Sequence, residues 1–555
     1  MHVHGLTNSI SPPVSEAYVR GNDPELAALF GGHAGDPDIW LRRADRLERH
    51  RHDRADAMRV AEALAAYNKR IGASGAALAN INRLAAGALA VVGGQQAGLF
   101  TGPVLVIHKA LSVIRAARWA EQKTGRPVVP VFWIAGEDHD WQEANHAFIV
   151  SHETGLVRIA VERDEHPRTS VSRTKLDRGR IEGAMRELAA ALPDSEHKPA
   201  LLDRIEAAAA RAETLSDWFG ALMADLFAED GLILMDADDP AIRAVEAPMF
   251  RRMVAENETL ASSFASAEAK LGRLGYTAQA ELQPDGANLF MFRDERFGGI
   301  GPGAPAGERV MLYRDGGNFV DKRRTFRLDR RELERLALEA PDLFSNNVLT
   351  RPLMQDYVLP VLATVLGQGE IAYWAQVGEA FRTFGMEMPI IVPRLEFTVV
   401  EGTVQKLLDK FGLSVEDALL RLEEKRTEWF KAQDELGIER LFADVRRRFD
   451  ELYAPVIETA GKINPGLRRL GETNRQKILE QITFMESHTR EAFESGFEAA
   501  SRQFDRIRVT LTPLGKRQER VFNPLAYMNK YGRGWIDELM RLKPNWNGLH
   551  NVILM

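Results

Sequence analysis

A glycine-rich segment, GGQQAGLFTGPVLVIHKA at residues 93–110, carries the first residues that could take part in chemistry. It follows a short apolar run and precedes an apolar-periodic stretch, a pattern that predicts a loop between a strand and a helix. In such a loop, backbone N–H groups and the positive end of the helix favour a bound anion. We therefore predict a nucleotide or substrate site here, formed by Gly94, Gln95, Gln96, Thr101 and Gly102. A tight turn without a ligand is the alternative.

Two basic residues in the helix after this loop are candidate catalytic residues, because both could neutralise a phosphate. They are His108 and Lys109. The order Thr-Gly-Pro and then His resembles the second histidine of the signature of class I aminoacyl-tRNA synthetases and related nucleotidylyltransferases. In those enzymes that histidine stabilises the transferred phosphate. The match is partial, because Leu105 and Ile107 replace the first histidine and a glycine. A histidine with a purely structural partner is the alternative.

A second polar motif, GEDHDWQEANH at residues 136–146, directly follows an apolar run. So many acids and histidines are costly to pack, which predicts a polar or ligand-filled site. Asp138 is a candidate catalytic residue. An amine, sugar hydroxyls or a ribose are the predicted ligands of Glu137, His139, Asp140, Asn145 and His146. A capped helix with solvated acids is the alternative.

Metal binding is a further interpretation of this motif. If Asp138 or Asp140 caps a helix, then His139, Glu143 and His146 share one helix face and could ligate a divalent ion. The spacing matches no known zinc motif, and we predict no metal site.

A third group follows an Asn-Asn turn at residues 346–347. Arg351 is a candidate clamp for a carboxylate, because a guanidinium binds carboxylates through two parallel hydrogen bonds. We predict that substrate or nucleotide is also bound by Gln355, Asp356, Glu370, Trp374 and Gln376. Capping of a helix by these residues is the alternative. The basic segment 514–524 could bind phosphate or dock onto the body of the protein, with simple ion pairing as its alternative.

The elements that must position these motifs form an α/β pattern. Short apolar runs alternate with helical stretches at residues 89–93, 128–135, 232–235, 362–367 and 390–392. This alternation predicts an open parallel sheet covered on both faces, with ligands at the carboxyl ends of its strands. We expect segments 146–180 and 275–325 to be insertions into a catalytic core spanning residues 1–400.

After residue 400 the pattern becomes helical. It pauses near Asp434 and is interrupted at Pro455 and Pro465; residues 466–509 then carry a coiled-coil-like apolar seam. A single helix of that length would span about 65 Å, so we expect a projecting arm over residues 401–510. We expect residues 511–555 to return to the core.

Composition excludes several classes of protein. The 555 residues carry 72 Lys+Arg against 79 Asp+Glu, a net charge of −7, which does not favour a nucleic-acid partner. The absence of cysteine excludes disulfides and a cysteine nucleophile. Without a signal peptide or a membrane-length apolar run, we expect a soluble cytoplasmic protein.

Several long blocks, taken together and in order, resemble the bacillithiol synthase family, also called putative cysteine ligase. The blocks are GGQQAGLFTGPVLVIHKA, VPVFWIAGEDHDWQEANH, TRPLMQDYVLPV, GEIAYWAQV, MPIIVPR and QERVFNPLAYMNKYG. They span about residues 90–531. One departure is visible, because the family often has Gly-Pro-Gly-Glu where this chain has Gly367-Gln368-Gly369-Glu370.

The resemblance implies a Rossmann-like core with connecting-peptide insertions and a coiled-coil arm that forms a homodimer. It implies the ligation of cysteine to glucosaminyl-malate, the last step of bacillithiol biosynthesis, with ATP and Mg²⁺ and without an organic prosthetic group. The class I-like core favours a cysteinyl adenylate over an acyl phosphate. Another carboxylate–amine ligase, a nucleotidylyltransferase and a non-catalytic coiled-coil scaffold are the alternatives.

Overall fold

The computed structural model describes residues 2–6, 12–21, 23–151, 155–163, 168–298, 305–543 and 548–555. The chain divides into two units, one of residues 1–398 with 519–553 and one of residues 399–518 with 554–555. The first division falls beside the boundary that we predicted at residue 400. The chain rejoins the first unit at Glu519, later than the predicted residue 511.

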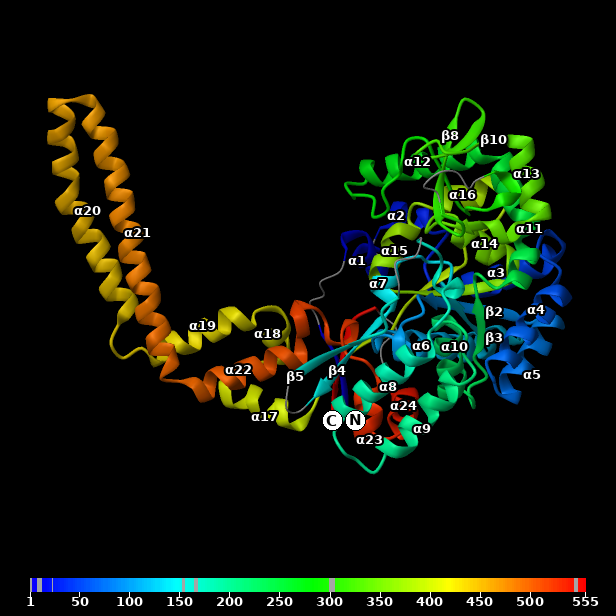
Figure 1. The fold of residues 1–555 in the computed structure, drawn as a ribbon, viewed down its shortest axis with the longest axis horizontal. Helices are drawn as coiled ribbons and strands as arrows, with labels where there is room; N and C mark the ends of the chain where they lie inside the picture. The colour runs from blue at the N-terminus through cyan, green and yellow to red at the C-terminus, as the bar shows by residue number, and fades with distance from the viewer. Residues whose placement is uncertain are drawn as a thin grey trace. The chain divides into compact units, whose positions relative to one another are not determined.

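The centre of the first unit is a five-stranded sheet of order β13-β12-β2-β3-β6, in which every neighbouring pair is parallel (Figure 1). Its strands are β2 (Leu89–Gln95), β3 (Val128–Ile134), β6 (Ile233–Asp236), β12 (Val361–Leu366) and β13 (Ile390–Pro393). All five coincide with the apolar runs that predicted them, so the open parallel sheet is confirmed. The strand order reverses between β2 and β12, and ligands bind at such a switch point in open α/β sheets.

Both faces of this sheet are buried, which explains why its strands are apolar throughout rather than alternating. On one face, α6 packs along β2, β3 and β12, and Phe219 of α10 contacts Phe132 of β3. On the other face, Val92 and Trp133 belong to a core shared with α4, α5 and α11. The helices of this unit are α1 (Pro13–Arg20), α2 (Pro24–Leu29), α3 (Ile39–Arg49), α4 (Ala57–Arg70), α5 (Gly75–Ala85), α6 (Leu105–Thr124), α7 (Trp141–Ala144), α8 (Arg178–Ala191), α9 (Lys198–Ala209), α10 (Leu215–Leu226), α11 (Pro240–Ala255), α12 (Asn257–Arg273), α13 (Arg330–Glu339), α14 (Arg351–Val358), α15 (Gln368–Trp374), α16 (Gly378–Thr383), α23 (Leu525–Tyr531) and α24 (Gly534–Arg541).

Two segments interrupt the alternation of strand and helix. The first holds the antiparallel hairpin β4 (His146–Ser151) and β5 (Gly155–Ala160). The second is a five-stranded antiparallel sheet, β10-β9-β8-β7-β11, made of β7 (Gly286–Phe292), β8 (Arg309–Asp315), β9 (Asn318–Asp321), β10 (Arg327–Asp329) and β11 (Phe344–Asn346). It continues past residue 325, where we expected the second insertion to end. Residues 152–154, 164–167 and 299–304 of these insertions lie outside the described residues.

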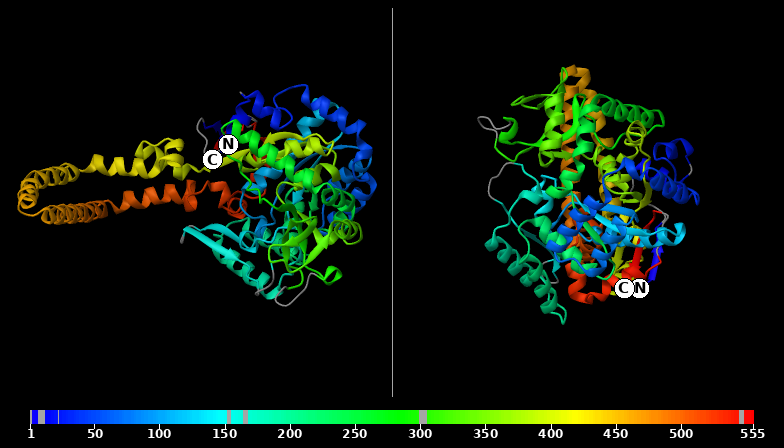
Figure 2. Two further views of the ribbon diagram at one scale, coloured as in Figure 1. Left: turned by 90° about the horizontal axis from the view of Figure 1, so that it is seen from above. Right: turned by 90° about the vertical axis from the view of Figure 1, so that its right-hand side faces the viewer.

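The second unit is helical, and its two longest helices, α20 and α21, lie side by side (Figure 2). Its helices are α17 (Gly402–Phe411), α18 (Val415–Leu420), α19 (Leu422–Gln433), α20 (Ile438–Ile463), α21 (Pro465–Ser495) and α22 (Glu498–Leu511). The expectation of one unbroken helix over residues 466–509 is therefore wrong. The helix ends at Ser495, and Gly496 and Phe497 separate it from α22.

The two prolines of this unit act differently. Pro465 is the first residue of α21, a position where its missing N–H has no helical partner to lose. Pro455 lies inside α20, so the interruption that we predicted there does not occur. Pro455 is exposed. Among the helices that the structure describes, none is both long and apolar enough to cross a bilayer.

Candidate active site

Lys109 lies at the switch point of the parallel sheet and joins its two halves. Its Nζ donates hydrogen bonds to the Gly94 carbonyl oxygen at 2.7 Å and to Gln95 Oε1 at 3.0 Å, at the end of β2. The same Nζ donates to Glu370 Oε2 at 2.5 Å, in the first turn of the helix after β12. Two loops that are far apart in sequence therefore share one ammonium group.

Burial sets the electrostatics of this pair. It lowers the pKa of Lys109, and the negative charge of Glu370 opposes that effect only in part. Burial alone would raise the pKa of Glu370, but the charge and hydrogen bond of Lys109 outweigh it and hold the pKa below its ordinary value. The Lys109 amine and the Glu370 carboxylate thus lie against each other at the carboxyl edge of the sheet.

The second motif meets the first through Gln96. The Gln96 amide donates to a carboxylate oxygen of Asp138 and, at 3.0 Å, to Glu143 Oε2. The other Asp138 oxygen accepts a hydrogen bond from the His139 backbone N–H at 2.7 Å. Gln95, Gln96 and Asp138, which we expected to share one cleft with His108, lie at neighbouring strand ends together with Lys109.

Glu137 lies deeper, in a chain of buried charges. Its carboxylate accepts a hydrogen bond from Arg243 Nη2, and Arg243 Nη1 donates to Glu246 Oε2 at 2.6 Å. All three side chains are buried. Burial raises the pKa of Glu246 to about 7, despite the opposing charge of Arg243. Arg243 was missed in the sequence, because it lies on α11, far from either motif.

Asp236 ends β6 and lies next to the start of the second motif. Its Oδ2 accepts a hydrogen bond from the Ser172 hydroxyl at 2.6 Å, and burial raises its pKa to about 7. A Cβ at residue 136 would overlap both the Ser172 hydroxyl and the Asp236 carboxylate, which explains the glycine there. Asp236 lies at the end of an apolar run, so its position at the end of a predicted strand could have identified it as a candidate site residue.

The two histidines of the second motif do not share a helix face. Helix α7 has only four residues, Trp141–Ala144, with Asp140 as its N-cap, and β4 already begins at His146. His139 precedes the helix and its Nδ1 lies 3.1 Å from Arg309 Nη1, whereas His146 Nδ1 contacts the Gln142 carbonyl oxygen at 2.9 Å. The single-face arrangement for a metal is therefore wrong. Within the described residues, no three His, Asp or Glu side chains are grouped to hold a metal ion.

Arg351 and Gln355 form a polar wall near the lysine–glutamate pair. Arg351 Nη2 donates to the Tyr373 hydroxyl at 2.8 Å, and Nη1 donates to Gln355 Oε1 at 3.1 Å. Burial opposes the charge of Arg351, but Tyr373 and Glu370 raise its pKa above the usual value. The Gln355 Nε2 is buried and has no hydrogen-bond partner among the described residues.

Three other predicted binding residues have structural partners instead. Asp356 is fully buried and accepts hydrogen bonds from Arg43 at 2.5 Å and Arg54 at 3.0 Å. Gln376 exchanges two 2.9 Å hydrogen bonds with the backbone of Ala280. Trp374 is part of the hydrophobic core. The contacts of these three side chains are therefore with the interior of the first unit and not with the Lys109–Glu370 pair.

His108 also points away from the Lys109 cluster, since consecutive residues on a helix diverge by about 100°. Its Nδ1 lies 2.9 Å from Glu519 Oε2, and Glu519 in turn accepts hydrogen bonds from Arg394 at 2.6 and 2.8 Å. The ring is buried, which lowers the pKa of His108. The structure does not place His108 beside Gln95 and Asp138, where contact with a transferred phosphate would require it.

The turn that ends the first loop is held by the segment near residue 520. The Asn523 Nδ2 donates to the carbonyl oxygens of Phe100 at 2.8 Å and Gly102 at 2.7 Å. Residues 100–102 all have positive φ, and the Thr101 Oγ1 is buried without a partner among the described residues. Within 514–524, Glu519 and Asn523 are therefore docking residues of the first unit. In the second motif, Asn145 is likewise buried, and its Nδ2 donates to Glu162 at 3.4 Å.

Comparison with known proteins covers both parts of the chain. Residues 1–395 match the model of the "Bacillithiol biosynthesis BshC, N-terminal Rossmann-like domain", and residues 397–555 match the "Bacillithiol biosynthesis BshC, C-terminal coiled-coil domain". Proteins named "Putative cysteine ligase BshC" from Geobacillus sp. and Geobacillus thermodenitrificans are 34% and 36% identical over 100% of both chains. One from Symbiobacterium thermophilum is 37% identical over 90% of each chain. The chain therefore belongs to the BshC family of bacillithiol biosynthesis.

Proposed function

We propose that this chain joins the carboxyl group of cysteine to the amino group of glucosaminyl-malate, with ATP as the energy source. The observation that carries the proposal is the Lys109–Glu370 pair at the switch point, with Gln96 and Asp138 beside it. A buried cation between two ligand-binding loops suits a reaction in which negative charge develops on phosphate. The names of the relatives supply the substrate class.

The residues around the first loop fit a nucleotide triphosphate. The loop offers backbone groups at the carboxyl end of β2, Lys109 as a cation and the unpartnered Thr101 hydroxyl as a hydrogen-bond donor. Glu143 offers a carboxylate oxygen to a magnesium ion that would also bind the phosphates. ATP, when bound, supplies the activation that makes amide formation from a carboxylate favourable.

The chain's own residues then have distinct roles. Arg351 and Gln355 bind the carboxylate of cysteine, because a guanidinium and an amide N–H are suited donors. Asp138 accepts the proton that the amino group of the sugar loses as the amide bond forms. Gln96 and the His139 N–H hold this carboxylate in one orientation, so its basic oxygen is presented to the amine.

A cavity of about 310 Å³ beside the second motif suits the acidic end of glucosaminyl-malate. It is lined by Trp141, Arg163, Arg173 and Lys175, among others. The Arg163 guanidinium lies over the Trp141 ring at 5.3 Å, and its Nη1 has no hydrogen-bond partner among the described residues. Malate carries two carboxylates, so a basic cavity with an aromatic wall fits this part of the substrate.

The second unit is proposed to form a homodimer. Its long helices expose large apolar side chains, among them Ile463, which is 78% exposed, Leu452, which is 76% exposed, and Leu470, which is 63% exposed. An apolar surface of this kind on a helical pair is typical of a coiled-coil interface.

The cellular experiment is deletion of the gene in its own host, followed by metabolite profiling. The proposal expects glucosaminyl-malate to accumulate and the cysteine-containing thiol to disappear. A plasmid copy of the wild-type gene should reverse both changes, and a Lys109→Met copy should reverse neither. Normal thiol levels in the deletion strain would contradict the proposal.

A further inference from the structure

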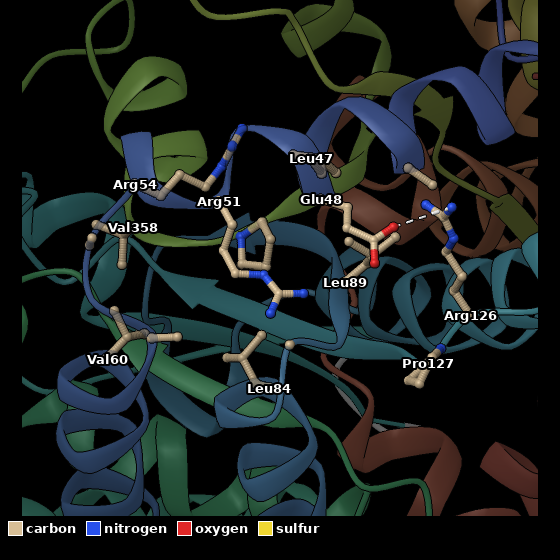
Figure 3. Close-up of a pocket in the computed structure, with 15 residues that line it drawn as sticks. Leu47, Glu48, Arg51, Arg54, Val60, Leu84, Leu89, Arg126, Pro127 and Val358 are labelled. Carbon is tan, nitrogen blue, oxygen red and sulfur yellow. Dashed lines mark ion pairs between the residues drawn. The ribbon is translucent and has the colours of Figure 1, made fainter.

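A second cavity lies at the amino-terminal edge of the parallel sheet, opposite the edge that carries the candidate active site. Its volume is about 130 Å³, and it is lined where β2, β3 and β12 begin, by Leu89, Pro127 and Pro360 (Figure 3). Ala57, Val60 and Leu84 of α4 and α5 contribute apolar walls. No residue of this cavity belongs to the site described above.

Among the residues that line the cavity, Arg51 is exposed and has no ion pair within the described residues, whereas the carboxylate Glu48 pairs with Arg126 at 3.4 Å. Arg51 points into the space bounded by Val60, Leu84 and Leu89 (Figure 3). Its guanidinium lies over Gly87, where a Cβ would approach Nη2 to 2.8 Å. Within the part of the chain that the structure describes, no carboxylate or carbonyl oxygen accepts a hydrogen bond from it. The other two arginines of the lining are paired: Arg54 contacts Asp356 at 3.0 Å, and Arg126 contacts Asp45 at 2.5 Å.

The end of helix α5 does not supply the missing partner. A helix C-terminus attracts cations through its unpaired carbonyl groups. Here the carbonyl oxygens of Asn82, Arg83 and Leu84 already accept hydrogen bonds from backbone N–H groups of the following turn. A second unused donor is the Arg126 Nη1, which is buried and has no partner among the described residues. Arg51 thus offers N–H donors to the cavity.

From these contacts we propose that this cavity binds a small monocarboxylate with a compact apolar body. The carboxylate would accept hydrogen bonds from Arg51, for which a planar guanidinium is suited. The apolar body would lie against Val60, Leu84, Leu89 and the two prolines. An apolar cavity of roughly 150 Å³ is known to hold one benzene ring. The cavity described here, at about 130 Å³, therefore suits a ligand whose apolar part is about the size of one such ring.

The test uses the full-length protein and phenylacetate, whose binding is measured by ligand-observed NMR titration. Phenylacetamide keeps the ring without the charge, and acetate keeps the charge without the ring. We expect phenylacetate to bind at least tenfold more tightly than either. Arg51→Gln should weaken it at least tenfold, and Ala57→Leu, which fills the cavity, should weaken it as much. Arg59→Gln, an exposed arginine of α4 outside the lining, is the matched control and should bind as the wild type does.

The alternatives give different results. Equal binding of phenylacetate and phenylacetamide would show an apolar cavity without a carboxylate site and would overturn the proposal. Binding that survives Arg51→Gln and Ala57→Leu would place the ligand elsewhere on the protein, with the same consequence. Failure of phenylacetate to bind at millimolar concentration would also overturn it.

Discussion

The carboxylate of Glu370 and the ammonium group of Lys109 form an ion pair that is costly to take out of water. A buried pair of this kind contributes little net stability, because the desolvation of both charges cancels much of their attraction. The Lys109 Nζ nevertheless donates hydrogen bonds to three oxygen atoms at two strand ends. Such an arrangement fixes the position of a positive charge more than it stabilises the fold, which is what a phosphate-binding site requires.

Asp236 should make stability depend on pH. Burial raises its pKa to about 7, so the folded protein holds a proton that the unfolded chain has already released above about pH 4. Stability should therefore fall as pH rises from about 4 to 7, by at most about 1.4 kcal/mol per pH unit from this group. Asp236→Asn does not titrate, so its stability relative to wild type should increase by a few kcal/mol across this range.

Urea unfolding of both proteins at pH 5, 6, 7 and 8 measures this difference. The Glu246 carboxyl, whose pKa is also about 7, is present in both proteins and contributes equally to each. If the difference between the urea midpoints of the two proteins is the same at every pH, Asp236 ionises normally in the folded protein.

His108→Ala should act mainly on stability. The change removes a buried ring and leaves Glu519 without one of its hydrogen-bond donors, which should cost about 2–4 kcal/mol. Turnover at a temperature where the variant is folded should fall less than tenfold, because the ring does not face the Lys109 cluster. Thermal unfolding and single-turnover kinetics on the same preparation separate the two effects. If the variant has wild-type stability but its turnover is reduced more than a hundredfold, His108 takes part in the reaction and its role is not structural.

Among the elements, the ends of the parallel strands could be predicted from the sequence. The side chains from other elements that contact those strand ends could not. Each parallel strand is an apolar run that stops at a polar motif, so the sequence contains the edge where Gln95 and Asp138 meet. The outward or inward direction of a helical side chain depends on neighbours that only the fold supplies. Glu370 and Trp374 lie one helical turn apart in the same short helix, yet one contacts Lys109 and the other is in the core. Arg243 and Arg309 enter from distant elements with no local signal.

Gly136→Ala should disturb the loop between β3 and α7. The added methyl group would overlap the Ser172 hydroxyl and the Asp236 carboxylate, and relief of that overlap should cost about 1–3 kcal/mol. The shift would also move Glu137 and Asp138, so turnover should fall at least tenfold. Gly75→Ala in α5 is the matched control, because a Cβ there meets no atom within 4 Å. Equal stability and turnover of the two variants would contradict this account of the loop.

At the scale of the whole molecule, the exposed apolar side chains of α20 and α21 predict self-association. Light scattering should give twice the chain mass of 62.1 kDa at micromolar concentration. Leu452→Glu combined with Leu470→Glu should yield monomers, since charges are costly in an apolar interface. Met58→Glu, at a 58% exposed position of the first unit, is the control and should leave the dimer intact. A wild-type monomer, or a dimer that survives the double substitution, would exclude this interface.

The ligation itself is the central claim, and one reconstitution tests it directly. Purified protein is supplied with cysteine, glucosaminyl-malate, Mg²⁺ and ATP, and the thiol product and the nucleotide are identified by mass spectrometry. We predict an amide-linked cysteine product that forms only with ATP, with AMP as the nucleotide product expected for an adenylate. Lys109→Met combined with Glu370→Gln removes the ion pair without leaving one charge buried alone, so it should fold and form product at least a hundredfold more slowly. No product from the wild-type protein, or equal rates from the two proteins, would contradict the account.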